Sequence, residues 1–152
     1  KLLWGDDAGF VIPDFVTDLG TDTEGILTRT VFIAKLGKVK PVTEQINDIF
    51  KTRTGEDFSG ASARSFTGLQ TWAYVLNKAG STDPKAIQEA ANGIDIPGDA
   101  LIMPWDGIKF DKTGQNTLGK GLIGQYQKEE LEVAYPFDLA TANMVYPFPG
   151  WK

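Results

Sequence analysis

The hydrophobic and polar positions divide the chain into two strand-like runs, three helices and a final stretch of short strands. Residues 2–4 (LLW) form an apolar run that predicts a short buried strand, and residues 5–9 (GDDAG) predict a loop at its carboxyl end. Residues 25–32 (GILTRTVF) are rich in β-branched side chains and predict a second strand. Between these runs, Pro13 suits the first turn of a short helix that Gly20 ends.

Three further helices are predicted in the middle of the chain. The first opens at Pro41, the second covers about residues 62–78 before Gly80, and the third has Asp83 as its N-cap. Each has apolar positions three or four residues apart, which is typical of a helix that packs one face against other elements. In the second helix this face consists of Phe66, Leu69, Ala73 and Leu76.

The character of the sequence changes after Gly93, where prolines and glycines divide the chain into short strands and turns. Residues 107–110 and 122–126 are predicted to form a hairpin-like pair, and residues 131–135 form another strand candidate. No repeat at a fixed period is present. Strands mixed with helices in this way indicate an α/β protein.

Composition excludes several classes of function. The chain has 152 residues and a net charge of -5, and no stretch carries the clustered Lys and Arg that phosphate backbones require, which argues against nucleic-acid binding. The chain contains no cysteine, so disulfides, thiolate nucleophiles and Cys-ligated metals are absent. It contains no histidine either, so His-dependent catalysis and His-ligated metals are absent too. Catalysis would therefore have to rest on carboxylates, lysine, tyrosine or a cofactor. No metal motif is present, and we predict a protein that has no cofactor and is not an enzyme.

Three motifs are better explained as ordinary structure than as sites. Residues 114–121 (GQNTLGKG) match the phosphate-binding loop G-x-x-x-x-G-K up to its last position, where Gly121 replaces the hydroxyl residue that holds magnesium. Residues 111–116 lack the alternating acidic ligands of a calcium loop and predict a β-turn. The acidic run at residues 129–132 is predicted to be a solvated face.

The loop after the first strand is the strongest candidate for a binding site. Asp6 and Asp7 directly follow an apolar strand, and the neighbouring glycines allow another group to approach the backbone. Ligands of open α/β sheets bind beyond the carboxyl ends of strands, and a carboxylate there accepts charge-assisted hydrogen bonds from an ammonium group. Phe10 is expected nearby as an apolar wall. The competing interpretation is that one aspartate caps the next helix while the other is solvated.

Five blocks in the same order give the chain a resemblance to a known family. They are residues 2–9 (LLWGDDAG), 18–27 (DLGTDTEGIL), 66–87 (FTGLQTWAYVLNKAGSTDPKAI), 107–116 (GIKFDKTGQN) and 147–151 (PFPGW). With these blocks the chain resembles the C-terminal part of the branched-chain amino-acid (Leu/Ile/Val) type of ABC-transporter substrate-binding protein.

The resemblance implies part of a bilobed, Venus-flytrap fold of periplasmic binding protein type 1, with Rossmann-like α/β lobes. It places residues 1–32 in the second lobe, residues 33–125 in a segment that returns to the first lobe, and residues 126–152 back in the second lobe. The N-terminal part of such a protein is then absent from this sequence, and a second chain or copy is a possible partner that completes the fold.

The resemblance also implies a function in transport. The expected role is to capture a small amino-acid-like ligand in the cleft between the lobes and to deliver it to the membrane permease of an ABC importer, from a periplasmic or lipid-anchored location. The family places an acidic residue in the strand-end loop to meet the α-ammonium of the ligand, and Asp6 matches that position with Asp7 as its neighbour. This sequence has two aspartates where Leu/Ile/Val binders have a single glutamate.

Two other classes of function remain open at this point. A carboxylate-based hydrolase, for example a glycosidase with Asp6 or Asp7 as one of its pair, requires a second carboxylate across a cleft, and the sequence nominates none. A ligand-sensing domain of a receptor would use the same bilobed fold.

Overall fold

A computed structural model of the protein describes residues 1–6 and 8–150, so Asp7, Trp151 and Lys152 lie outside the described residues. The elements are β1 (Leu3–Trp4), α1 (Pro13–Leu19), β2 (Ile26–Thr30), α2 (Pro41–Thr54), α3 (Gly60–Ala79), α4 (Pro84–Asn92), β3 (Ile96–Pro97), β4 (Gly107–Ile108), β5 (Leu122–Gln127) and β6 (Glu130–Tyr135). Short 3-10 helices lie between them, among them η1 (Ala8–Phe10), η3 (Ala34–Lys38) and η5 (Phe137–Leu139).

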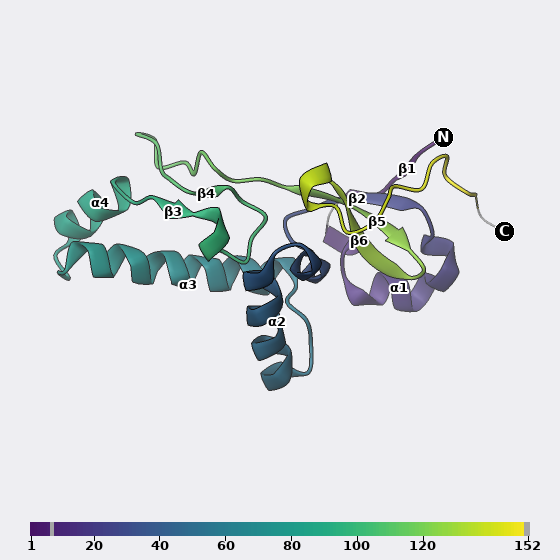
Figure 1. Cartoon of the computed structure of the whole chain (residues 1–152), viewed down its shortest axis with the longest axis horizontal. Coiled ribbons are helices and arrows are strands. Elements are labelled where there is room, and N and C mark those ends of the chain that lie inside the picture. The colour runs from purple at the N-terminus through teal and green to yellow at the C-terminus, as the bar shows by residue number, and fades with distance from the viewer. Residues whose placement is uncertain (7, 151–152) are drawn as a thin grey trace.

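A four-stranded sheet with the order β1-β2-β5-β6 joins the two ends of the described chain (Figure 1). β1 runs parallel to β2, while β5 is antiparallel to both of its neighbours, β2 and β6. The register places Leu27 opposite Gln125, and the Gln125 amide donates a hydrogen bond to the Gly25 carbonyl at 3.2 Å. Near the edge of the sheet, the Phe148 amide donates to the Lys1 carbonyl at 2.9 Å. Residues more than a hundred positions apart therefore build one half of the molecule.

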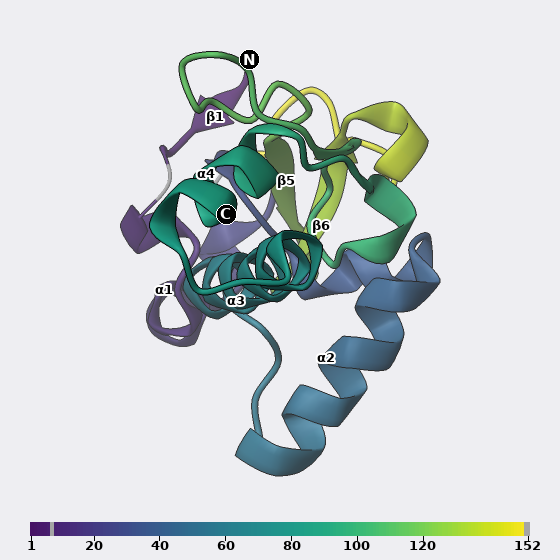
Figure 2. The same ribbon diagram turned by 90° about the vertical axis from the view of Figure 1, so that its left-hand side faces the viewer.

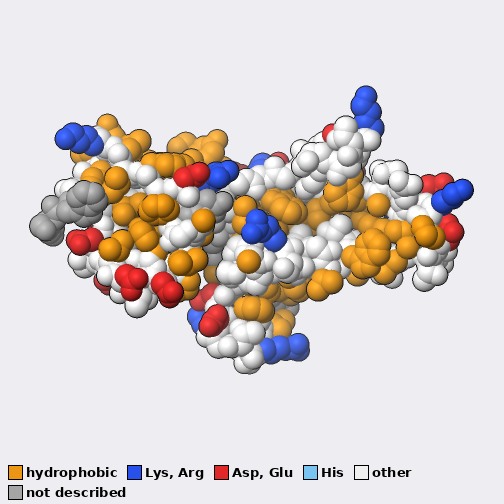
Figure 3. Space-filling view, turned by 180° about the vertical axis from the view of Figure 1, so that it is seen from behind, with side chains coloured by type: hydrophobic (Ala, Val, Ile, Leu, Met, Phe, Trp, Pro, Cys, Tyr) orange, Lys and Arg blue, Asp and Glu red, His pale blue; other side chains and the backbone are white. Residues whose placement is uncertain are grey.

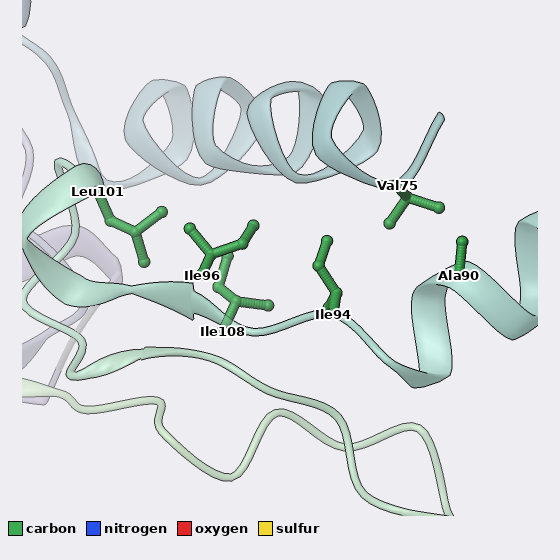
Figure 4. Packing of buried hydrophobic residues seen from close by; sticks show 6 residues of the cluster. All are labelled: Val75, Ala90, Ile94, Ile96, Leu101 and Ile108. Atoms are coloured by element: carbon green, nitrogen blue, oxygen red, sulfur yellow. The ribbon is translucent and has the colours of Figure 1, made fainter. Parts of the chain in front are cut away.

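The helices α2, α3 and α4 form the other half together with the small β3-β4 ladder. Figures 1 and 2 both show α2 projecting away from the rest of the molecule. Beneath α3, buried side chains from α3, α4 and the β3-β4 ladder pack into one apolar cluster (Figure 4). The cluster consists of Val75, Ala90, Ile94, Ile96, Leu101 and Ile108. A second cluster around Phe32, Phe58 and Met103 lies where the chain leaves the sheet for the helices.

The helix ends follow from local sequence. Pro13, Pro41 and Pro84 occupy the first turns of their helices, where the missing N–H costs nothing. The Asp83 carboxylate caps α4 by accepting hydrogen bonds from two backbone amides of its first turn. Gly80 ends α3 in the left-handed conformation with φ 57°, which a side chain would disfavour. These helices are confirmed as predicted, apart from one or two residues at their ends.

Two strand predictions differ from the structure. Residues 107–110 do not pair with residues 122–126, because β4 pairs with β3 and β5 instead lies between β2 and β6. The first strand is not buried, since β1 pairs on one side only and leaves the side chains of Leu2 and Trp4 about half exposed. A strand at the edge of a sheet is covered less than the apolar character of its residues suggests.

The buried face of α3 is also not the predicted one. The buried residues of α3 are Ala63, Thr67 and Val75, whereas Leu69 is 72% exposed and Trp72 is half exposed. Val75 packs with α4 and the β3-β4 ladder, and Ala63 packs in the second cluster. Hydrophobic side chains gather on the surface of the half that α3 and α4 occupy (Figure 3). The small residues of α3 thus face its neighbours within the chain, and the larger apolar ones remain uncovered.

Candidate functional site

The loop after β1 is held in place by its own backbone and by aromatic packing. The Gly5 amide donates a hydrogen bond to the Leu27 carbonyl of β2 at 2.9 Å. A Cβ atom at Gly5 would lie 2.4 Å from the ring of Phe10, so only glycine allows this close approach without moving the ring. The Tyr126 hydroxyl donates to the Phe10 carbonyl at 2.8 Å and the ring of Phe15 contacts Phe10 edge-on. The loop is therefore anchored to β5 and α1.

Asp6 and Arg29 form a bidentate ion pair at the carboxyl ends of two neighbouring parallel strands. The Arg29 Nε donates to Asp6 Oδ1 at 3.1 Å and Nη2 donates to Oδ2 at 3.2 Å. Arg29 points outward because Thr28 and Thr30 on either side of it in β2 are buried. Both charged side chains remain more than half exposed. Asp6 thus lies in the loop that follows β1, and its charge is balanced by a guanidinium that the sequence reasoning did not identify.

A cavity of about 400 Å³ lies beside Arg29, where the chain passes from the sheet to the helices and back again. Its lining is Arg29, Thr30, Val31, Trp105, Gln115, Asn116, Gly119, Lys120 and Gly121. Lys120 forms an ion pair with Asp106 at 2.6 Å. The cavity therefore combines two paired cations, two amides and the indole of Trp105, a lining that suits a polar small molecule rather than a purely apolar one.

Neither Asp6 nor Phe10 lines this cavity, although Asp6 pairs with Arg29, which does. Phe10 instead lines a separate cavity of about 450 Å³ together with Leu3, Phe15 and Ile26. Asp7 lies outside the described residues.

A buried carboxylate was also missed by the sequence reasoning. Glu132 of β6 is 8% exposed and accepts hydrogen bonds from Lys35 and Lys38 of η3 and from Thr141. Burial raises the pKa of Glu132, but the hydrogen bonds from Lys35, Thr141 and Lys38 outweigh it and hold that pKa below its ordinary value. The acidic run at residues 129–132, predicted to be solvated, therefore has one member that joins the sheet to the segment leading into α2.

Among residues 1–6 and 8–150, no three or more Asp or Glu side chains are grouped in a way that could hold a metal ion. Within the same part of the chain, no helix has the length and apolar character needed to cross a membrane.

No family model matches the chain. Over 105 residues the chain is 29% identical to Leu/Ile/Val-binding protein homolog 8 of Brucella abortus, a match that covers 68% of this chain and 26% of that protein. The chain therefore spans about a quarter of the length of the curated relatives that it matches.

Solved structures match the chain more completely. A leucine-binding protein from Thermotoga maritima superposes with a TM-score of 0.67 and 18% identity over 88% of this chain and 36% of that one. An extracellular ligand-binding receptor from Rhodopseudomonas palustris gives a TM-score of 0.69 and 16% identity over 88% of this chain and 41% of that one. A substrate-binding protein of an ABC transporter from Desulfitobacterium hafniense, in complex with Leu, gives a TM-score of 0.63 and 14% identity. This match covers 87% of this chain and 35% of that one. The predicted fold, an α/β portion of a type 1 periplasmic binding protein, is confirmed.

Proposed function

Because this chain resembles the Leu/Ile/Val type of ABC-transporter substrate-binding protein, we propose that it is part of the solute-binding component of an ABC importer and not an enzyme. Its solute is a small amino-acid-like molecule, and its partner is the membrane permease of the transporter. The location that goes with this role is periplasmic, or lipid-anchored outside the cytoplasmic membrane.

The Asp6–Arg29 pair is the observation that supports this proposal most. It lies at the carboxyl ends of β1 and β2, the position where ligands of α/β sheets bind. A carboxylate and a guanidinium side by side present both signs of charge, which complements the ammonium and carboxylate groups of an amino acid. In this proposal the ammonium of the solute meets Asp6, and Asp7 contributes as its neighbour.

The solute cleft lies between two lobes that the chain shares with further sequence. Residues 1–32 and 126–152 contribute to one lobe and residues 33–125 to the other. β5 (Leu122–Gln127) crosses this proposed boundary and pairs with β2 along residues 122–125. Closure of the lobes around the solute is the signal for the permease.

Calorimetric titration of the complete protein with individual amino acids tests the proposal. We expect one solute to bind, and Asp6→Ala to weaken it by about 2 kcal/mol, a factor of about 30, because the ammonium loses its charged partner. Asp48→Ala, which removes an exposed carboxylate from α2, is the matched control and should leave affinity unchanged. Turnover of an amino acid, amide or glycoside that Asp6→Ala abolishes would overturn the proposal, as would equal affinities in the two variants.

A further inference from the structure

Three aromatic rings form a row beside the loop that carries Asp6. The ring centroids of Phe10 and Phe15 are 5.2 Å apart, and those of Phe15 and Tyr126 of β5 are 5.4 Å apart. Phe10 is 37% exposed and Tyr126 is 2% exposed, so the row leads from the surface loop to an enclosed side chain. Aromatic pairs at such separations stabilise each other beyond the area that they bury. These three residues are here called the aromatic brace.

The hydroxyl of Tyr126 ties the brace to the backbone of the loop. It donates a hydrogen bond to the Phe10 carbonyl at 2.8 Å, and Phe10 is the last residue of η1, shortly after Asp6. At the start of the loop, the Gly5 amide donates to the Leu27 carbonyl of β2 at 2.9 Å. Asp6 therefore belongs to a short segment that is tied to β2 at one end and to β5 at the other.

Gly5 and Phe10 bring the two ends of this segment into contact. A Cβ atom at Gly5 would lie 2.4 Å from Cδ1 and 2.7 Å from Cγ of the Phe10 ring, so an alanine there would displace the ring. Gly5 does not have a positive φ, so the nearby ring rather than the backbone conformation requires a glycine. One methyl group at Gly5 is therefore enough to disturb the brace.

The ion pair of Asp6 with Arg29 depends on where the loop backbone lies. Its two contacts, at 3.1 Å and 3.2 Å, require the carboxylate to face the guanidinium in one orientation. Both side chains are more than half exposed, and an exposed ion pair contributes little to holding two side chains in a fixed geometry. The contacts that hold the loop on both sides of Asp6 therefore matter for the geometry of the pair.

We propose that Tyr126 is a positioning residue for solute binding, which holds the loop through the aromatic brace so that Asp6 meets the solute. Tyr126 is buried and bonds to the loop, so it acts through Asp6 rather than on the solute itself. This inference rests on the proposed function, in which the Asp6 carboxylate receives the ammonium group. A binding group that is already in place loses less entropy on binding, so a looser loop lowers affinity.

Calorimetry of the complete protein, titrated with the standard amino acids one by one, tests this role. Tyr126→Phe keeps the ring and removes only the hydroxyl, and it should weaken the amino acid that binds by about fivefold, the effect of one hydrogen bond. In an Asp6→Ala background the same change should have no further effect, because Tyr126 acts through Asp6. Tyr74→Phe removes a hydroxyl from an exposed tyrosine of α3 and is the matched control, with unchanged affinity. Lower stability of Tyr126→Phe with unchanged affinity would overturn the proposal.

A second pair of variants tests the brace itself. Gly5→Ala should weaken the same amino acid by about tenfold, because its methyl group displaces the Phe10 ring. Added to Phe10→Ala, it should cause no further loss, since the ring that it displaces is gone. Gly68→Ala adds the same methyl group to α3, where no other atom lies within 4 Å, and should leave affinity unchanged. An equal effect of Gly5→Ala with and without the Phe10 ring would contradict the brace.

The ion pair provides a measurement that needs no solute. The Arg29 Nε–H group donates to Asp6 and has its own NMR signal, which Asp6→Ala should shift. Tyr126→Phe should move this signal part of the way towards its position in Asp6→Ala, whereas Tyr74→Phe should not. An unshifted signal in Tyr126→Phe overturns the positioning role whatever the affinities are.

The two proposals fail in different ways. If Asp6→Ala leaves the affinity for every amino acid unchanged, the proposed function fails, and the role of Tyr126 in solute binding fails with it. If Asp6→Ala weakens binding and Tyr126→Phe does not, only the positioning role fails.

Discussion

Glu132 Oε1 lies 2.7 Å from Lys35 Nζ, although 97 residues separate the two in the sequence. The pair joins the last strand of the sheet to η3, the short helix through which the chain enters α2. Lys38 of the same helix contacts the same carboxylate at 3.0 Å, so one buried acid is shared by two lysines.

Replacing Glu132 with glutamine should lower the free energy of unfolding by about 1–3 kcal/mol, because the lysines then face an uncharged partner. Glu130→Gln is the control: Glu130 also pairs with Lys35 but its side chain is 63% exposed, so the expected loss is below about 1 kcal/mol. Urea unfolding at neutral pH measures both values. Equal losses of unfolding free energy in the two variants would contradict the larger contribution that we assign to the buried Glu132.

The Glu132 pair also predicts a pH dependence. The folded pKa of Glu132 is lower than its ordinary value of 4.5, so its contribution to stability is complete above that value and is lost as the pH falls through the folded pKa. Unfolding measured between neutral pH and about pH 3 should therefore show a smaller acid-induced loss of stability in Glu132→Gln than in the unmodified chain. An identical acid profile would contradict this assignment.

Tyr126 should ionise later than an ordinary tyrosine. Burial raises its pKa to about 12, and its hydroxyl donates to the Phe10 carbonyl. Its contribution to stability is complete below the ordinary value of 10.0 and is lost as the pH rises through the folded pKa. A spectrophotometric titration should show one tyrosine with a pKa near 12, and Tyr126→Phe should remove that phase and cost about 1 kcal/mol.

Asn47 should be important for the connection between α2 and α3. Its buried side chain donates to Asp57 at 2.7 Å and accepts from the Phe58 amide at 2.8 Å. Asn47→Ala leaves that amide without a partner and should cost about 1–3 kcal/mol. It should also raise the pKa of Asp57, since the hydrogen bond from Asn47 is the main cause that holds that pKa down. NMR titration of the Asp57 carboxyl measures the second effect, and an unchanged pKa would contradict it.

The uncovered face of α3 predicts association. Leu69 and Trp72 are exposed next to each other on one helix, and large exposed apolar patches favour binding to another surface. The 152-residue chain alone should therefore associate with a second copy as its concentration rises, and Leu69→Lys should reduce that association. Asn77→Lys adds the same charge elsewhere on the helix and should have little effect. Analytical ultracentrifugation of the three chains provides the test, and a strictly monomeric chain would contradict it.

The sequence predicted the helices well because the residues that begin and end a helix act on their immediate neighbours. Pro41, Asp83 and Gly80 act within one turn of the helix that they begin or end, so no knowledge of the rest of the fold is needed. Which face of α3 is buried depends on what packs against it, and the apolar stripe with Leu69 pointed to the uncovered side. The predicted partner of β5 was wrong for the same reason, because β5 pairs with β2, a strand far away in the sequence.

The candidate site was predictable only in part. The glycine-acid loop after an apolar strand located Asp6, because the end of a strand can be recognised in the sequence. Its partner Arg29 comes from the next strand, and no pattern at that spacing indicates an ion pair. In the sequence Glu132 is one member of an acidic run, and its hydrogen bonds from two lysines can be seen only in the fold.

The pairing of β2 with β5 has a consequence for how the protein is made. Gln125 contacts Gly25 across 100 residues, so the centre of the sheet cannot form until synthesis has passed residue 125. The helices between these strands depend mainly on contacts with nearby residues and can form while synthesis continues. During that interval β2 still lacks its antiparallel partner β5 and presents an unpaired edge. The time of greatest exposure to aggregation therefore falls before β5 leaves the ribosome, and slowing translation between α2 and β5 would lengthen it.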